Sequence, residues 1–245
     1  LQEAHAILGK ISENDYMLHF PYQSYDYVLR FFNEAAIDPF VTTIKVTLYR
    51  VASNSLIVNA LISAARNGKK VIVFVEIKAR FDEENNLHWA NQMKEAGIRI
   101  IYSMPGLKVH AKVALIKRKD NSGQIRLFGF LGTGNFNEVT ARIYTDAGLF
   151  TAHKGILREI NALFNHLEKG KPVKSIKHCL ISQFNIIDRF SELIDRALDH
   201  ARKGKPAAIT SKMNNLEDQE MIEKLYEASS AGVSIRLIVR GICCL

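Results

Sequence analysis

Hydrophobic residues along the chain form short β-branched runs, such as residues 71–75, that alternate with amphipathic stretches. Such runs are typical of strands and such stretches of helices, and their alternation predicts a sheet covered by helices, the α/β class. In the first half the pattern predicts helices over 24–36, 56–66, 86–95 and 153–166, and strands over 43–49, 71–77, 98–102, 109–117, 125–131 and 146–150.

A break at residues 168–172 divides the chain. It places Gly170 and Pro172 among charged residues, a composition that stops a helix and favours an exposed linker. We therefore predict one domain over residues 1–170 and a second over residues 171–245. In the second domain the pattern predicts strands over 176–182, 207–212 and 234–239, and helices over 185–202 and 217–229.

The order of the elements repeats between the two halves. Gly68 precedes a strand in the first half as Gly232 does in the second, an offset of 164 residues (232 − 68), and the same offset pairs Val46 with Thr210. A matching order at a fixed offset is typical of a duplicated α/β unit. The chain begins without methionine and stops after a strand-like run, so we expect a piece of a longer polypeptide whose second unit is truncated.

Composition and charge narrow the class of partner. The 245 residues are 47% hydrophobic, as in globular proteins, which argues against disorder, coiled coil and collagen-like repeats. The apolar runs are shorter than the ~20 residues that a membrane helix needs. With 33 Lys and Arg against 25 Asp and Glu the net charge is +8, which favours a polyanion: nucleic acid, nucleotide, polyphosphate or lipid headgroup.

The cysteines and the basic residues exclude several classes of site. Three cysteines without C-x-x-C spacing predict neither a disulfide framework nor a zinc site, and they fit a reducing cytoplasm. The seven histidines other than His110 lack the spacing of metal ligands, so histidine ligation of a metal is not indicated. The basic run 117–119 lacks interleaved aromatic residues that stack on bases, so no nucleic acid partner is expected.

The candidate catalytic residues are His110 and Lys112, which enter a predicted strand. Strand alternation places both on one side, with the apolar Val109, Ala111 and Val113 on the other, core side. The Gly-rich segment 132–137, with Asn135 and Asn137, follows the next strand. Together they form a cradle for phosphate, with histidine as nucleophile and lysine and loop N–H groups as charge stabilisers. A plain surface histidine remains the alternative.

Three arginines, Arg50, Arg80 and Arg240, stand at the ends of predicted strands. Ligands of open α/β sheets lie beyond the carboxyl ends of the strands, so the three guanidinium groups are expected to converge on one site. Guanidinium forks bind phosphate oxygens in pairs and stabilise a transferring phosphoryl group. Solvated or structural ion pairs are the alternative reading of each arginine.

Taken together, these and neighbouring motifs carry a family resemblance. They are HFPY (19–22), TLYRVA (47–52), EIKARFDEE (76–84), VHAK (109–112), GTGNFN (132–137), YTD (144–146), KMN (212–214) and VRG (239–241). On these motifs, which span nearly the whole chain, the sequence resembles the C-terminal part of the bacterial polyphosphate kinases, the ATP-polyphosphate phosphotransferases. The resemblance implies two phospholipase D-like α/β domains, the second truncated here, in agreement with the inferred duplication.

The resemblance also implies an activity. It is the reversible transfer of the terminal phosphate of ATP to inorganic polyphosphate through a phosphohistidine, with magnesium, in the cytoplasm. It further implies a homo-oligomeric full-length protein and no nucleic acid partner, and leaves peripheral membrane association open. By motif, His110 corresponds to the phosphorylated histidine. Arg50 and Arg80 match residues that hold phosphate near magnesium through shared phosphate oxygens, and Tyr144 and Arg240 match nucleotide contacts. Lys112, Asn135 and Asn137 complete the expected ATP-binding set.

Two alternatives remain open at this point. A phospholipase D-like phosphodiesterase or nuclease would use the same His110 without ATP, but such proteins carry an acidic residue where this chain has Lys117. A non-catalytic polyanion-binding module would use only the charge of +8. The counterpart of His110 in the second repeat is expected near position 274 (110 + 164), so we expect the chain alone not to turn over.

Overall fold

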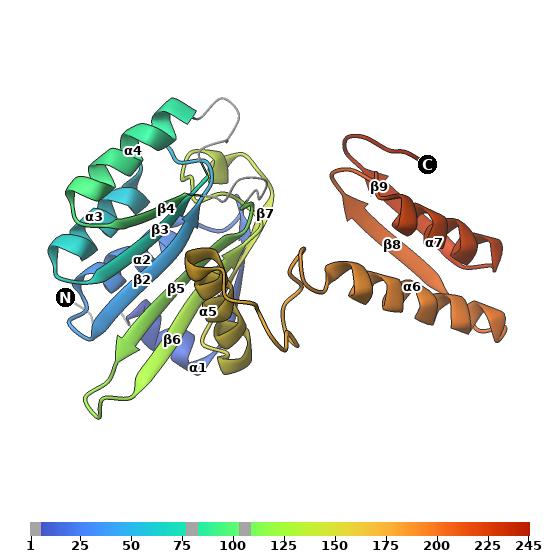
Figure 1. The fold of residues 1–245 in the computed structure, drawn as a ribbon, viewed down its shortest axis with the longest axis horizontal. Coiled ribbons are helices and arrows are strands. Elements are labelled where there is room, and N and C mark those ends of the chain that lie inside the picture. Colours follow the sequence, from blue (N-terminus) through green and yellow to red (C-terminus); the bar gives the residue numbers. More distant parts are fainter. Residues whose placement is uncertain (1–5, 77–82, 103–108) are drawn as a thin grey trace. The chain divides into compact units, whose positions relative to one another are not determined.

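The structure, a computed structural model, describes residues 6–76, 83–102 and 109–245 (Figure 1). It divides into two compact units, one up to Lys174 and one from Ser175 onward. The division falls a few residues after the expected boundary at Gly170. The first unit contains α1 (Ile7–Glu13), β1 (Tyr16–Phe20), α2 (Asp26–Ile37), β2 (Val41–Leu48), α3 (Leu56–Arg66), β3 (Lys70–Val75), α4 (Glu83–Glu95), β4 (Arg99–Tyr102), β5 (Lys112–Lys119), β6 (Ile125–Gly132), the 3₁₀ helix η1 (Thr140–Arg142), β7 (Asp146–Thr151) and α5 (Lys154–Lys169).

The first unit is built on a seven-stranded mixed sheet in the order β1-β7-β6-β5-β2-β3-β4. The strands β2, β3 and β4 are parallel and are joined by the helical crossovers α3 and α4, whereas β5, β6, β7 and β1 continue the sheet antiparallel. Parallel strands need such crossovers, while β5 and β6 need only a hairpin. In that hairpin Asp120 accepts from the backbone of Ser122 and Gln124, and Gly123 takes a positive φ of 83°.

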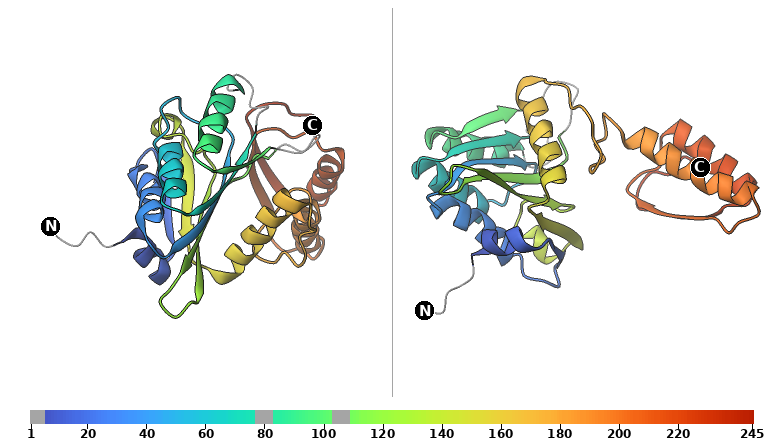
Figure 2. Two further views of the ribbon diagram at one scale, coloured as in Figure 1. Left: turned by 60° about the vertical axis from the view of Figure 1, so that its left-hand side comes forward. Right: turned by 90° about the horizontal axis from the view of Figure 1, so that it is seen from below.

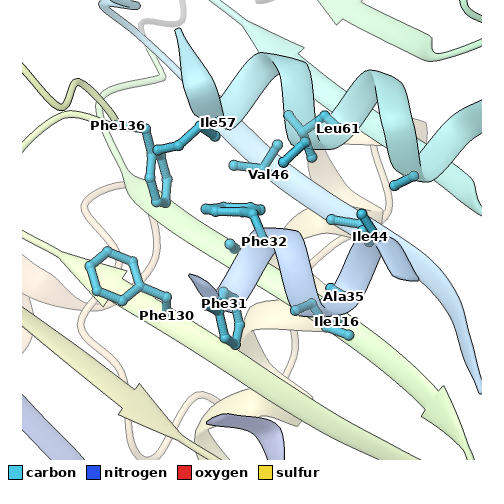
Figure 3. Close-up of a cluster of buried hydrophobic side chains, with 14 of the residues drawn as sticks. Phe31, Phe32, Ala35, Ile44, Val46, Ile57, Leu61, Ile116, Phe130 and Phe136 are labelled. Carbon is cyan, nitrogen blue, oxygen red and sulfur yellow. The ribbon is translucent and has the colours of Figure 1, made fainter. Parts of the chain in front are cut away.

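The larger core lies on the face of the sheet covered by α1, α2 and α3, and α4 adds Trp89 and Met93 to it. The helix α2 buries Val28, Phe31, Phe32 and Ala35, the spacing that places side chains on one face of a helix. Phe32 lies at the centre of this cluster between the sheet and α3 (Figure 3).

The opposite face of the sheet is covered by α5 (Figure 2). This helix is capped at its start by His153, whose Nδ1 accepts from the N–H of Ile156, and at its end by Gly170, which has a positive φ of 66°. Phe164 packs against Phe74 of β3 with ring centroids 5.5 Å apart. Both faces of the central strands are therefore buried, which explains the continuous apolar run of residues 71–75 in β3.

A buried ion pair joins α5 to the sheet. Glu168 of α5 contacts Lys45 of β2 at 3.4 Å and Arg99 of β4 at 2.8 Å, and Lys45 also donates to Asn165 at 3.3 Å. Burial lowers the pKa of Lys45 below its ordinary value, and the Glu168 carboxylate opposes that shift. The side chains of Lys45 and Glu168 are 6% and 5% exposed, so the Lys45 ammonium depends on Glu168 for its counter-charge, whereas Glu168 is also paired with Arg99.

Glu168→Gln keeps the size of this side chain but removes the charge that Lys45 and Arg99 share. We expect the free energy of unfolding to fall by about 3 kcal/mol, because a buried ammonium loses its counter-charge. Urea unfolding followed by the fluorescence of Trp89, the single tryptophan, measures this. The control Glu13→Gln breaks the exposed Lys10–Glu13 pair and is expected to change the value by less than about 0.5 kcal/mol. Equal losses in both variants would contradict this account.

The second unit contains α6 (Ile186–Arg202), β8 (Ala208–Met213), α7 (Gln219–Ser230) and β9 (Ser234–Val239). Its two strands are parallel, and one face of the pair packs against α6 and α7 through alternating residues such as Ile209, Ile235 and Leu237. Along both strands the other alternating positions are exposed. No helix within the described ranges is long and apolar enough to cross a membrane.

Each unit contains two parallel strands connected by a helix, which is the element order that the expected duplication requires. In the first unit Thr43 pairs with Lys70 and Leu48 with Val75; in the second Ala208 pairs with Ser234 and Met213 with Val239. In both units a helix lies between the two parallel strands in the sequence and ends shortly before a glycine with positive φ. The α2-β2-α3-β3 segment thus has the same element order and parallel pairing as α6-β8-α7-β9, although paired residues are 27 apart in the first unit (70 − 43) and 26 apart in the second (234 − 208).

Some sequence expectations were wrong. Residues 176–182 form no strand, although they include Ile176 and Ile181. Instead the side chain of Asn185 bonds the N–H of Ile181 and the carbonyl of Cys179, a local arrangement that replaces strand pairing. The elements α1 and β1 were not expected. The first is only seven residues long, and the second is mostly exposed and lacks a clear alternation.

Candidate active site at one edge of the sheet

The expected site residues lie at one end of the strands of the seven-stranded sheet. At this end, called here the edge of the sheet, β2, β3 and β6 finish and β5 and β7 begin. Leu48 and Val75 pair at the carboxyl ends of β2 and β3, and Lys112 at the start of β5 pairs with Gly132 at the end of β6. Gly132 in turn pairs with Gly148 of β7. Because neighbouring strands lie about 4.8 Å apart, the loops at these ends are close enough to contact one ligand.

His110 lies in the loop just before β5 and is exposed. The expected strand over 109–117 in fact begins at Lys112, so His110 is outside the strand. Its ring meets the ring of Tyr49 edge-on, with centroids 4.8 Å apart and an interplanar angle of 81°. The ammonium of Lys112 donates to the main-chain carbonyl of His110 at 2.5 Å. The histidine is therefore accessible, and both its ring and its backbone are held.

Lys112 and Arg50 lie against the same aromatic ring. Lys112 Nζ is 5.3 Å and Arg50 Cζ 5.9 Å from the centroid of Tyr49, distances at which a cation is attracted to a ring. Tyr49 is buried, 7% exposed, whereas Arg50 is exposed. The structure thus brings three of the expected site residues, Arg50, His110 and Lys112, together around one tyrosine.

The expected division of β5 into a polar and an apolar side was wrong. Lys112 is only 6% exposed and lies on the same side of β5 as Ala114 and Ile116, which belong to the larger core. Val113 and Leu115, on the other side, are buried as well. The reason is that α5 covers the second face, which the local pattern does not reveal.

The backbone around His110 is fixed by two buried side chains. Thr47 of β2 donates through Oγ1 to the carbonyl of Ala111 at 2.6 Å and accepts from the N–H of Val113 at 3.1 Å. The carboxylate of Glu76, which follows β3 and is 2% exposed, accepts from the N–H of Val109 at 3.1 Å. The segment that carries His110 is thus tied to β2 and to the end of β3.

The helix α4 holds the segments that follow β2 and β3. Asn86 donates through Nδ2 to the carbonyl of Tyr49 at 2.8 Å and to that of Glu76 at 3.1 Å. One turn later Trp89 donates through Nε1 to the carbonyl of Ala52 at 3.0 Å. These three bonds satisfy main-chain carbonyls in the segments that follow β2 and β3, beyond the ends of the two strands.

The Gly-rich segment 132–137 is shaped in large part by packing. Phe136 is 1% exposed, and its ring lies 5.5 Å from those of Phe32 and Phe130 (Figure 3). The side-chain oxygen of Asn137 accepts from the N–H groups of Val139 and Thr140 at 3.0 Å and so caps η1. These contacts give Asn137 a structural role, and its part in phosphate binding stays a prediction.

Gly134 is required by the close approach of Asp146. A Cβ atom at Gly134 would lie 2.4 Å from Asp146 Oδ2. Asp146 accepts from the hydroxyl of Thr133 at 2.7 Å, and that hydroxyl accepts from the N–H of Ala147 at 3.0 Å. This glycine therefore lets the loop pack on the start of β7.

Gly134→Ala is expected to displace Asp146 and break its bond to Thr133, lowering the free energy of unfolding by about 1–3 kcal/mol. Gly9→Ala in α1 is the matched control, since its Cβ would meet nothing closer than 4.0 Å. In a helix the exchange is expected to raise the free energy of unfolding by about 0.5–1 kcal/mol. Opposite signs in urea unfolding confirm the packing role of Gly134; a neutral Gly134→Ala contradicts it.

Asn135 and Tyr25 line a small crevice beside Asp146. Within the described part of the chain, Asn135 Oδ1 is buried without a hydrogen-bond partner, and the Tyr25 hydroxyl is buried close to the backbone of Asn137. Burial, and next the charge of Glu138, raise the pKa of Tyr25 well above its ordinary value.

The remaining expected site residues are placed as follows. Tyr144 lies between η1 and β7 at the same edge and is 59% exposed. Arg240 directly follows β9 in the second unit, is exposed, and donates through Nε to Asn214 Oδ1 at 2.9 Å. Arg80 lies outside the described residues.

Comparison with known proteins assigns the family. The family profile "Polyphosphate kinase C-terminal domain 1" matches residues 6–173, and "Polyphosphate kinase C-terminal domain 2" matches residues 179–245. The chain belongs to the polyphosphate kinase family. It is 46% identical to the polyphosphate kinase of Escherichia coli K12 over 96% of this chain and 34% of that protein. It therefore spans about a third of the length of the curated relatives it matches.

Solved structures agree with the family and the fold. The crystal structure of polyphosphate kinase from Porphyromonas gingivalis aligns with a TM-score of 0.88 at 49% identity, covering all of this chain and 41% of that one. NucT from Helicobacter pylori aligns with a TM-score of 0.50 at 16% identity over 63% of this chain and 95% of that one, a likeness of fold alone. The expected α/β class is confirmed.

The residues that support the candidate site, Glu76, Thr47 and Asn86, were not predicted from the sequence. Glu76 follows an apolar strand run directly, as the arginines do, so the same argument could have singled it out. Thr47 sits within a buried strand, where a hydroxyl needs a partner, which is a weaker signal. Asn86 lies in an ordinary helical stretch, and only the structure reveals its two bonds.

Proposed function

We propose that this chain carries the catalytic histidine of an enzyme that transfers the terminal phosphate of ATP reversibly to inorganic polyphosphate. The observation that carries the proposal is the exposed His110, whose ring contacts Tyr49, the same tyrosine that Lys112 and Arg50 contact. A nucleophile flanked by two fixed cations suits the transfer of an anionic phosphoryl group. Membership of the polyphosphate kinase family supports the choice of donor and acceptor.

The transfer takes two steps. A ring nitrogen of neutral His110 uses its lone pair to form a bond to the γ-phosphorus of ATP, while the bond from that phosphorus to the bridging oxygen breaks and ADP leaves with the electron pair. A terminal oxygen of polyphosphate then attacks the same phosphorus, and the nitrogen–phosphorus bond breaks. Lys112 and Arg50 stabilise the negative charge spread over the transferring oxygens in both steps. Arg80 is proposed to join them.

The described residues do not form a protein-built magnesium site. No cluster of three acidic, histidine or cysteine ligands is present in the described ranges, and the cationic groups of Arg50 and Lys112 are not ligands for a metal ion. In the proposed reaction magnesium belongs to the substrate, bound to the phosphates of ATP. Arg50 and Arg80 would then share phosphate oxygens with it rather than ligate it.

The remaining parts of the proposal concern the nucleotide and the whole polypeptide. Tyr144, an exposed aromatic ring, and Arg240, an exposed cation, are proposed to contact ATP, with Asn135 and Asn137 near the phosphates. We place the enzyme in the cytoplasm as a homo-oligomer, with no nucleic acid partner. Because its relatives are about three times longer, the chain by itself is expected not to turn over.

His110→Ala tests the first step directly. With γ-labelled ATP and magnesium, the full-length enzyme is expected to acquire an acid-labile, base-stable label that falls by at least about 1000-fold in this variant, since the nucleophile is gone. His88→Ala, which removes an exposed histidine of α4, is the control and should label normally. No label on the unmodified enzyme under turnover conditions would overturn the proposal.

Arg50→Ala separates a phosphate clamp from a diffuse polyanion-binding surface. A clamp predicts a fall in kcat/KM of about 100-fold, because a charge aimed at the transferring oxygens is lost. Arg126→Ala removes the same charge at the far end of β6, at the opposite edge of the sheet, and should stay within about twofold. Equal and small effects, both abolished by salt, would favour the polyanion-binding module.

A further inference from the structure

We propose that Asn86 of α4 is a positioning residue for His110, acting through Tyr49 and Glu76. The inference rests on the proposed function of His110 and adds a residue that does not itself touch the substrate. Its basis is one buried amide that bonds the main chain at two separate strand ends.

Asn86 is almost fully buried, 1% exposed, at the first turns of α4. An amide NH₂ group has two donors, and here Nδ2 serves two acceptors, the carbonyls of Tyr49 and Glu76. Those residues follow β2 and β3, so one side chain links the ends of two neighbouring parallel strands. The Glu76 N–H also donates to the carbonyl of Leu48 at 3.0 Å, which links the end of β3 directly to the end of β2.

Each residue that Asn86 holds contacts the segment that carries the nucleophile. The ring of Tyr49 lies edge-on to that of His110, 4.8 Å away, and the carboxylate of Glu76 accepts from the N–H of Val109. The ring of His110 and the backbone just before it therefore depend on two residues that share one support. A shift of the Asn86 amide would move both contacts together.

A second residue of α4, Trp89, supports the same positioning role. Trp89 bonds the carbonyl of Ala52, so the segment from Tyr49 to Ala52 is held at both ends by one helix.

The expected effect is on the rate of chemistry. A displacement of about 1 Å at a reacting group costs roughly 100-fold in rate. In the full-length enzyme we expect Asn86→Ala to slow the labelling of His110 at saturating ATP by about 10- to 100-fold. The KM for ATP should change less than about threefold, because Arg50 and Lys112 remain.

Two controls on the same helix separate positioning from stability. Asn91→Ala removes the same amide from an exposed position and should label at the normal rate. Met93→Ala removes a core side chain, 1% exposed, and should lower the melting temperature at least as much as Asn86→Ala while labelling within about threefold of the normal rate. If Met93→Ala slows labelling as much as Asn86→Ala does, the role of Asn86 is merely structural.

Amide hydrogen exchange provides a readout that does not depend on the reaction. In Asn86→Ala the peptide covering Val109 to Val113 should exchange at least about fivefold faster, and in Met93→Ala it should not. Failure to label the unmodified enzyme would overturn the proposed function but leave this test of positioning intact. Normal labelling together with unchanged exchange in Asn86→Ala would overturn the positioning role alone.

Discussion

The site depends on the position of β2 in the sheet, between the parallel strand β3 and the antiparallel strand β5. That placement makes the carboxyl ends of β2 and β3 and the start of β5 coincide at one edge. A slip of one residue in either pairing would turn every side chain to the opposite face. The register is held by burial on both faces and by Thr47, whose hydroxyl bonds the backbone on both sides of Lys112. Arg50, Tyr49 and His110 meet because these strands end together.

Packing and chemistry share residues at this edge. Phe136 anchors the Gly-rich loop in the larger core, and Gly134 admits Asp146, so much of a sequence that suggests phosphate binding is explained by close packing. By contrast, Lys112 is a charged side chain buried against Tyr49, and core packing alone does not favour a buried ammonium. The electrostatic case for the site therefore rests more on Lys112 and Arg50 than on the loop.

Much of the fold could be predicted because its signals are local. The helix over 56–66 and the strand over 234–239 were expected with the bounds that the structure has, since caps and turn glycines mark their ends. The strand over 176–182 was wrong, because strand formation needs a partner that composition does not report. The candidate site shows the same difference between local signals and contacts over long sequence distances. His110, Lys112 and Arg50 were predicted from strand ends and residue chemistry, and all three contact Tyr49 in the structure; their catalytic roles stay a prediction. The bonds of Asn86 and Thr47 could not be predicted, because they join segments far apart in the sequence.

The central claim is that His110 receives the phosphoryl group from ATP. Mapping the phosphorylated peptide of the full-length enzyme by mass spectrometry at neutral to basic pH, where a phosphoramidate survives, tests it most directly. The account predicts an added phosphoryl group on the peptide containing Val109–Lys112, on the imidazole, which is lost when polyphosphate is added. A phosphoryl group on any other residue, or none while the enzyme turns over, would contradict it.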